Sequence, residues 1–340
     1  MTTSMMTIWA RIWAEGQEQC IFPTATNPHL DDIRIPVLDW VLKNNLGDEA
    51  AIAAYKTLDY DGHTAYIYPT ASYSELVLAT KWMTWFFLFD NHLDEQPVEA
   101  ISPGTLAFLK SMDRIVTTGP AYTPDEETLT CPYAQALVEL WNESRIIYHN
   151  PGWERRLASK FYDYQQALLW EIHNRRFNRV WDLQTYVEMK RSGTGSLLGA
   201  SFVELFVNTP ASDAFLDSFL CAKFLHTGAD LLHLAADIRS YEREKVLGSM
   251  QNIVSAHQHT FDYSTREAQE AFIGTWNKKA RCFRQFREDL DQLMLSQGME
   301  AHYLTSVQEY IDTFMLWMGG TMKWIAITSR YAAIDTSTAN

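Results

Sequence analysis

The chain has 340 residues, of which 47% are hydrophobic and 13% aromatic, and 12 of them are tryptophan. A chain of this length and composition can form one large or two ordinary globular domains with a sizeable core. The 28 basic and 42 acidic residues leave a net charge of −14, which argues against nucleic acid or an anionic membrane as the main partner.

The cysteines and the amino terminus narrow the class of protein further. Four widely spaced cysteines, with no Cys-x-x-Cys pair, signal neither a zinc site nor a disulfide framework. The first residues contain no uninterrupted apolar run of signal-peptide length, and no stretch approaches the ~18 apolar residues of a membrane span. We therefore expect a cytoplasmic protein without a membrane span.

Taken in chain order, the apolar pattern predicts an all-α fold of about ten or more helices. Residues 1–34 look irregular because of their prolines, and 58–72 and 118–131 look like loops. Helices are predicted over residues 35–47, 48–57, 73–95, 103–117, 132–149, 152–176, 183–193, 211–245, 266–296 and 300–333. Because helical patterning resumes directly after the second loop, we expect a single domain over 1–340, with a flexible tail at 334–340.

The stretch KWMTWFFLFDNHLDE, residues 81–95, combines an apolar helix with carboxylates. Five of its residues recur at helical offsets of three and four: Met83, Phe86, Phe87, Asp90 and Asp94. They share one face, so the two acids continue an aromatic strip, where an unpaired buried charge is costly. The stretch is either a helix end with exposed acids or a place where a hard cation is held at the mouth of an aromatic cavity.

A second group of oxygen-bearing side chains lies in AADIRSYEREKVLGSMQN. Asp237, Ser240 and Glu244 recur at offsets of three and four on one helix face, where a hydroxyl and a carboxylate one turn apart can chelate magnesium. Arg243 and Lys245 beside them can bind phosphate oxygens, the arginine as a fork. The alternative is a solvated helix face with pairs of opposite charge.

Two further segments place an arginine beside glycine or aromatic residues. In YVEMKRSGTGS, Arg191 precedes two glycines separated by a threonine, so the helix there can break and expose backbone groups to a ligand. The alternative is an ordinary C-terminal glycine cap. Near the carboxyl end, Trp317, Trp324 and Tyr331 recur every seven residues and share a face next to Arg330, either as a binding surface or as core.

In this order and at roughly these separations, the four segments resemble the class I terpene synthases in their bacterial-type single-domain form, over most of the chain. NPHLDDIRIPVLDWV resembles the N-terminal helix of that family, and residues 81–95 resemble its aspartate-rich motif, with Asp90 as the leading metal ligand. YVEMKRSGTG resembles the helix-break segment, in which Arg191 would be the pyrophosphate sensor, Thr194 the linker and Gly195 the effector. ADIRSYERE and SRY resemble the second metal motif and the terminal Arg-Tyr pair.

The resemblance implies a helical bundle around an aromatic-lined cavity, three magnesium ions, and a linear prenyl diphosphate that is cyclised with release of pyrophosphate. Farnesyl diphosphate is the common substrate in that family, geranylgeranyl diphosphate is the alternative, and a homodimer is usual. The implied metal ligands are Asp90, Asp94, Ser240 and Glu244. The implied diphosphate ligands are Arg191, Arg243, Lys245, Arg330 and Tyr331. The implied carbocation wall is Phe86, Phe87 and Trp324, and the tryptophans interpreted as core behind it are Trp82, Trp85 and Trp317.

Two positions depart from the motifs of that family. Asn91 stands where a second acid is expected, and Ala236 stands where the second motif has a metal-binding asparagine. One magnesium ion should therefore lack a protein oxygen, which water can replace. The alternative is that Asp237 swings in to supply the oxygen, although it points about 100° away from position 236 on a helix. A weakly active or non-catalytic prenyl-diphosphate-binding relative is the alternative that Ala236 leaves open.

Two other classes of protein share parts of these patterns. A chain-elongating prenyltransferase would show two aspartate-rich motifs, and this chain shows one. Four residues with iron or zinc ligand chemistry line one helix face at offsets of four, three and four: His226, Asp230, His233 and Asp237. Their alternative role is polar packing, and the sequence contains no partner Glu-x-x-His motif.

Overall fold

The computed structural model describes residues 8–12, 14, 22–94, 96–119, 123–246, 250–296 and 301–331. Within these residues all regular structure is helical, which confirms the all-α prediction. The α-helices are α2 (Leu30–Lys43), α3 (Glu49–Leu58), α4 (Tyr60–Ile67), α5 (Tyr73–Asp94), α6 (Pro103–Thr118), α7 (Glu126–Leu129), α8 (Pro132–Tyr148), α9 (Pro151–Arg176), α10 (Leu183–Gly193), α11 (Ser196–Ala200), α12 (Asp213–Leu216), α13 (Phe219–Val246), α14 (Ile253–Phe261), α15 (Thr265–Ser296) and α16 (Ala301–Ile327). Short 3-10 turns lie at Val98–Ala100, Val203–Leu205 and Ser329–Tyr331.

Local sequence sets where several helices begin. Proline occupies the first turn of α6, α8 and α9, where its missing N–H breaks no helical hydrogen bond. The side chains of Asp48, Asp182 and Asn252 accept a backbone N–H at the starts of α3, α10 and α14. Each such cap stabilises a helix by ~1 kcal/mol. The caps of α10 and α14 define the starts of two helices that contribute to the site described below.

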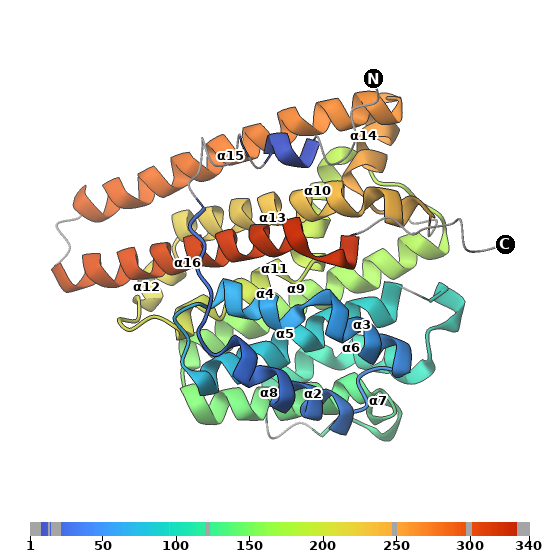
Figure 1. Ribbon diagram of the computed structural model, residues 1–340, viewed down its shortest axis with the longest axis horizontal. Helices are drawn as coiled ribbons and strands as arrows, with labels where there is room; N and C mark the ends of the chain where they lie inside the picture. Colours follow the sequence, from blue (N-terminus) through green and yellow to red (C-terminus); the bar gives the residue numbers. More distant parts are fainter. Residues whose placement is uncertain are drawn as a thin grey trace.

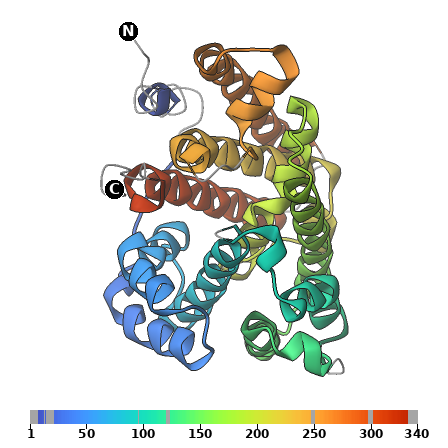
Figure 2. The same cartoon turned by 90° about the vertical axis from the view of Figure 1, so that its right-hand side faces the viewer.

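The helices form a bundle with α13 and α16 near its centre. Figure 1 shows α14 and α15 on one side of this pair and the helices from α2 to α8 on the other. α13 packs along α15, α16 packs along α4, and α9 packs along α6 and α10. Figure 2 shows the same layers from the side, with the light green α9 running along one flank of the bundle. Segments far apart in the sequence therefore meet at the ends of α5, α9, α10 and α13.

Aromatic side chains fill much of the interior. Six tryptophans are less than 2% exposed: Trp82, Trp85, Trp141, Trp153, Trp276 and Trp324. On α5, Trp82 stacks on Phe86 with the ring centres 5.8 Å apart, and Trp85 stacks on Phe89 at 5.2 Å. Trp82 donates its indole N–H to Ser144, and Trp85 donates to a main-chain carbonyl. The interpretation of these two tryptophans as core is confirmed.

Residues 58–72, predicted to be a loop, contain the helix α4. Asp59 adopts the left-handed conformation, with φ of 56°, and separates α3 from α4. α16 approaches α4 very closely, because a Cβ on Gly320 would lie 2.2 Å from the main-chain oxygen of Tyr66. This contact with a distant helix stabilises α4 and overrides the local loop signals of Gly62 and its neighbours.

The segment predicted to be irregular at 1–34 is partly helical. Residues 8–12 form a helical turn, and α2 begins at Leu30. The side chains of Ile8 and Ile12 are fully buried against the rest of the core. Burial of this apolar face, which only the folded chain provides, stabilises the helical turn. Pro23 and Pro28 lie outside both helical segments.

Later boundaries also differ from the prediction. The predicted loop at 118–131 contains the short helix α7, and α14 lies in a stretch for which no helix was predicted. The helix predicted over 300–333 ends at Ile327, and the predicted tail at 334–340 lies outside the described residues. Within the described part of the chain, no helix combines the length and apolar character needed to cross a bilayer.

Candidate active site

The first edge of the site consists of two carboxylates at the end of α5: Asp90 and Asp94. Asp90 Oδ2 forms an ion pair with Arg330 Nη2 at 2.7 Å, and Arg330 also donates to the side-chain oxygen of Asn91 at 2.6 Å. Asp94 lies one turn later, is half exposed, and pairs with Arg175 of α9 at 3.2 Å. Each carboxylate of the first edge is therefore held by a guanidinium group.

The second edge consists of three side chains on α13: Asp237, Ser240 and Glu244. Asp237 Oδ2 accepts hydrogen bonds from the hydroxyl of Tyr186 and, at 3.2 Å, from the backbone N–H of Ile253. Asn252 Nδ2 donates to Glu244 Oε2 and to the main-chain oxygen of Asp237, at 2.9 Å in both cases. Burial, and after it the charge of Glu244, raises the pKa of Asp237 to about 8.

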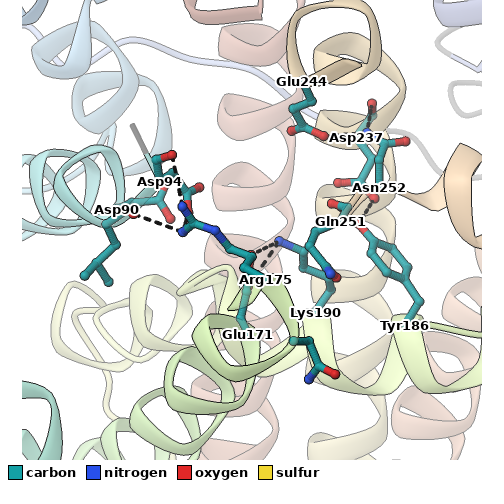
Figure 3. A network of polar contacts seen from close by, with 12 residues as sticks. Asp90, Asp94, Glu171, Arg175, Tyr186, Lys190, Asp237, Glu244, Gln251 and Asn252 are labelled. Carbon is teal, nitrogen blue, oxygen red and sulfur yellow. Dashed lines mark hydrogen bonds and ion pairs between the residues drawn. The ribbon is translucent and has the colours of Figure 1, made fainter. Parts of the chain in front are cut away.

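Lys190 of α10 lies between the two edges (Figure 3). Its ammonium group donates to Glu171 of α9, with N–O distances of 3.2 and 3.4 Å. Burial acts to lower the pKa of Lys190, but the carboxylates of Glu171 and of both edges raise it far above its ordinary value. The same positive charge acts on Asp90 at one edge and on Asp237 and Glu244 at the other. The two edges therefore face each other across Lys190.

Arg191, predicted to sense pyrophosphate, turns away from this cluster toward Asp230. Asp230 is 1% exposed and accepts from Arg191 Nε at 2.7 Å and from Lys279 at 2.5 Å. Glu188 pairs with the same guanidinium group at 2.6 Å. Arg191 therefore braces α10 against α13, and its neighbour Lys190 is the cation that reaches the acids. Adjacent residues on a helix point about 100° apart, so both cannot face the cluster.

The predicted helix break lies next to Lys190. α10 ends at Gly193, and α11 starts at Ser196. Gly195 has φ of 69° and ψ of 0°, a left-handed conformation that a larger residue adopts only with strain. A Cβ on Gly193 would stand 3.8 Å from a carboxylate oxygen of Glu171, so the break borders the acidic cluster. Thr194 Oγ1 shares a hydrogen bond with the hydroxyl of the first residue of α11.

Phe86 and Phe87 precede Asp90 on α5 and reach different neighbours. Phe86 packs among the core rings beside Trp82, with 9% of its surface exposed. Phe87 is partly exposed and stacks on Tyr60 with the ring centres 4.4 Å apart. The guanidinium carbon of Arg330 lies 5.4 Å from the centre of the Phe87 ring. Phe87 therefore connects the aromatic interior with the first edge.

Trp324, predicted to be part of the carbocation wall, lies in the core instead. It is 1% exposed and packs behind Phe87, with the ring centres 5.0 Å apart. Its indole N–H donates to the main-chain oxygens of Leu58 and Asp59. These bonds fix the ring at the junction of α3 and α4, and the rings of Tyr60 and His63 pack around it together with Phe87. Trp317 is 3% exposed, as expected for a core residue.

The other predicted diphosphate ligands are distributed unevenly. Arg243 is partly buried on α13, and its charge acts on Asp90 of the first edge. The pKa of Tyr331 is raised to about 12, mainly by burial, and the charges of Arg330 and Asp90 also act on it. Lys245 does not join them: it is exposed, and its ammonium group lies 6.0 Å from the centre of a neighbouring aromatic ring. Ala236 is partly buried and offers no side-chain oxygen.

The oxygen donors of both edges suit magnesium, because hard cations prefer carboxylate and hydroxyl ligands. Among the described residues, no three His, Cys, Asp or Glu side chains are grouped closely enough to hold an ion. An ion bound at either edge therefore needs further ligands, such as water or an anion. Ammonium and guanidinium groups also lie between the acids of the two edges. Because no three such side chains are grouped in the described part of the chain, there is also no support for the alternative iron or zinc site, which would consist of His226, Asp230, His233 and Asp237.

Sequence reasoning missed five residues of the cluster: Glu171, Arg175, Tyr186, Lys190 and Asn252. Glu171 and Arg175 lie one turn apart on α9, inside a correctly predicted helix but without a motif to single them out. Lys190 is adjacent to the arginine that the motif did single out. Asn252 caps α14, a helix that was not predicted. The only local sequence signal for any of these residues was that Lys190 lies next to Arg191.

Known proteins resemble this chain over most of its length. Residues 81–281, more than half of the chain, match the family described as terpene synthase family 2, C-terminal metal binding. Pristinol synthase of Streptomyces pristinaespiralis is 27% identical over 316 residues, which cover 91% of this chain and 83% of that protein. The 4-epi-cubebol synthase ((2E,6E)-farnesyl diphosphate cyclizing) of Streptosporangium roseum is 24% identical over 324 residues, covering 92% and 90%.

Solved structures show the same fold. The crystal structure of a-eudesmol synthase aligns with a TM-score of 0.78 and 20% identity, covering 90% of this chain and 97% of that one. A family match over more than half of the residues, together with relatives aligned along nearly their whole length, decides the classification. The chain belongs to terpene synthase family 2 and is a class I terpene synthase.

Proposed function

We propose that this enzyme uses magnesium to convert farnesyl diphosphate into a cyclic sesquiterpene hydrocarbon or alcohol and inorganic pyrophosphate. The observation that carries the proposal is the pair of acidic edges on either side of Lys190, with Arg330 next to them. Alternating anionic and cationic groups suit metal ions and a diphosphate that bind together. One relative names farnesyl diphosphate as its substrate, which favours a C15 over a C20 chain.

Magnesium would be held by oxygen ligands on both edges. Asp90 would bind it at the first edge, and Ser240 and Glu244 would bind it at the second; the family resemblance implies three ions in all. Bound magnesium would supply positive charge that stabilises the diphosphate as a leaving group. Asp94 is a further ligand candidate; like Asp90 it pairs with a guanidinium group, that of Arg175 at 3.2 Å, which it would have to exchange for the ion.

Three cations and one hydroxyl would bind the diphosphate: Lys190, Arg243, Arg330 and Tyr331. Arg330 presents a planar fork that matches phosphate oxygens, whereas Lys190 provides a point charge. Arg330 is bonded to Asp90 in the structure, so diphosphate binding has to exchange that partner for a phosphate oxygen. This exchange would link substrate binding to the release of a metal ligand at the first edge.

The chain's own groups suit the charge separation of the reaction. The allylic C–O bond breaks, its electron pair leaves with the diphosphate, and a carbocation remains on the hydrocarbon. Fixed cations such as Lys190 stabilise the departing anion. The faces of Phe86 and Phe87 stabilise the carbocation without forming a bond to it. The break at Gly195 is the part that we expect to move when the site closes and excludes water.

The test is an assay of purified protein with magnesium and prenyl diphosphates of ten, fifteen and twenty carbons. Gas chromatography of the extracts should show a cyclic terpene from farnesyl diphosphate, with pyrophosphate released in equal amount. Absence of any terpene from the C15 and C20 substrates would refute the proposal. Heat of prenyl diphosphate binding without pyrophosphate release would instead support a non-catalytic binder, the alternative that Ala236 suggests.

A further inference from the structure

The family resemblance implies three oxygen ligands at the second edge, and Ala236 stands where one of them, an asparagine, is expected. In that pattern the ligands would be four residues apart, at position 236, Ser240 and Glu244. Asp237 precedes Ser240 by three residues and Glu244 by seven. Over seven residues a helix rotates by about 20° less than two full turns. The side chains of Asp237 and Glu244 therefore point in nearly the same direction from α13. The chain therefore offers a second spacing for three oxygen ligands.

Asp237 is held in place through one of its two carboxylate oxygens. Oδ2 accepts from the Tyr186 hydroxyl on α10 and from the backbone N–H of Ile253 at the start of α14. No hydrogen bond to Oδ1 is found among the described residues, and the whole residue is 7% exposed. This geometry fixes the carboxylate and leaves one of its oxygens for a ligand.

Hydrogen bonds also orient Glu244 and Ser240, the other two candidate ligands. Asn252 Nδ2 holds Glu244 Oε2 at 2.9 Å and the main-chain oxygen of Asp237 at 2.9 Å. The Ser240 hydroxyl donates its hydrogen to that same main-chain oxygen at 3.2 Å, which leaves the lone pairs of its own oxygen for a cation. Hydrogen bonds from neighbouring groups orient the ligands of metal sites in just this manner.

We propose that Asp237 replaces the missing asparagine, so that Asp237, Ser240 and Glu244 together hold one magnesium ion. This inference rests on the proposed function of the site. Two carboxylates and a hydroxyl carry one more negative charge than an amide, a hydroxyl and a carboxylate, and ligand charge strengthens the binding of a hard cation. The side-chain oxygen of Asn252 is engaged, because Oδ1 accepts from the backbone N–H of Val254 at 2.9 Å.

The test counts bound manganese(II) by electron paramagnetic resonance in the presence of inorganic pyrophosphate, without a prenyl substrate or turnover. Asp237→Ala should lose one ion per chain or bind it at least ~10-fold more weakly. Adding Ala236→Asn to that variant should restore the ion, because the amide returns a ligand at the other spacing. Glu242→Ala, which removes an exposed carboxylate from the same helix, is the matched control and should change nothing. Unchanged manganese binding in Asp237→Ala would overturn the assignment.

The single substitution Ala236→Asn tests the assignment without removing a buried group. If Asp237 already supplies the third ligand, the added amide leaves the number and the Kd of bound manganese ions unchanged. Tighter binding would show that a ligand was missing and would overturn the assignment, as would the absence of manganese binding by the unaltered chain. Circular dichroism checks that each variant folds. Pyrophosphate release from farnesyl diphosphate is measured separately, so an inactive chain that shows these manganese differences would refute only the proposed function.

Discussion

The two acidic edges are held by different kinds of partner. At the first edge the partners are guanidinium groups, in the pairs Asp90–Arg330 and Asp94–Arg175. At the second edge they are neutral donors, in the pairs Asp237–Tyr186 and Glu244–Asn252. A guanidinium group neutralises a carboxylate, whereas a hydroxyl or amide only orients it. The first edge therefore has to release a cation before it binds metal, and the second edge is already oriented for one.

The largest effect is expected when either edge loses its main carboxylate. Asp90→Ala and Glu244→Ala should each lower kcat by about 1,000-fold, equivalent to about 4 kcal/mol of transition-state stabilisation. Both changes remove charge that holds magnesium against the leaving group. Pyrophosphate release under saturating substrate measures the effect, and circular dichroism checks the fold. Near-normal turnover in both variants would show that the edges do not carry the chemistry.

The next effect separates Lys190 from its neighbour Arg191. Lys190→Met should lower kcat/KM by about 100-fold, because a fixed positive charge facing both edges is lost. Arg191→Met should act mainly on folding and lower the free energy of unfolding by about 2–3 kcal/mol, because buried Asp230 keeps only Lys279 as a partner.

Urea unfolding and steady-state kinetics on both variants distinguish these two roles. Lys190→Arg is the matched control and should recover part of the activity, because the guanidinium group keeps the charge. If Arg191→Met instead lost activity at unchanged stability, Arg191 would be the diphosphate ligand that the sequence pattern predicted.

The smallest effect concerns two buried histidines, one near each edge. Burial lowers the pKa of His63, which packs against Phe87, to about 3, and chiefly burial lowers the pKa of His233 on α13 to about 4. An unfolded histidine titrates near pH ~6.5, so the unfolded state binds the proton first. The stability contributed by each neutral ring is therefore complete above that pH and is lost as the pH falls toward the folded value.

Substitution of each histidine by leucine should flatten the fall of Tm at acidic pH. The effect of His233→Leu should level off near pH 4, whereas that of His63→Leu should continue toward pH 3. Thermal melts between pH 3 and pH 8 measure both slopes against the unaltered chain. Identical acid slopes in all three proteins would contradict the assignment of buried neutral rings.

Most of the fold could be predicted from local patterns. The helix predicted over 73–95 is α5, Tyr73–Asp94, and the one predicted over 152–176 is α9, Pro151–Arg176. Apolar periodicity and cap residues act over a few residues, so a linear pattern contains them. The prediction was wrong at α4, where Gly62 and Pro69 are typical of a loop. That helix is stabilised by α16, which lies far along the chain.

The sequence by itself determined which acids, arginines and aromatic residues occur, and in what helical spacing. Only the tertiary structure decided which of them meet. Lys190 and Arg191 are adjacent in the chain, yet Asp230 on another helix holds Arg191 and so turns Lys190 toward the acids. Glu171 joins the cluster from a segment without a motif, and Asn252 joins it from the end of the second motif segment, where no spacing singled it out. The physical reason is that the direction of a side chain depends on how its helix is rotated against its neighbours, which is a property of packing.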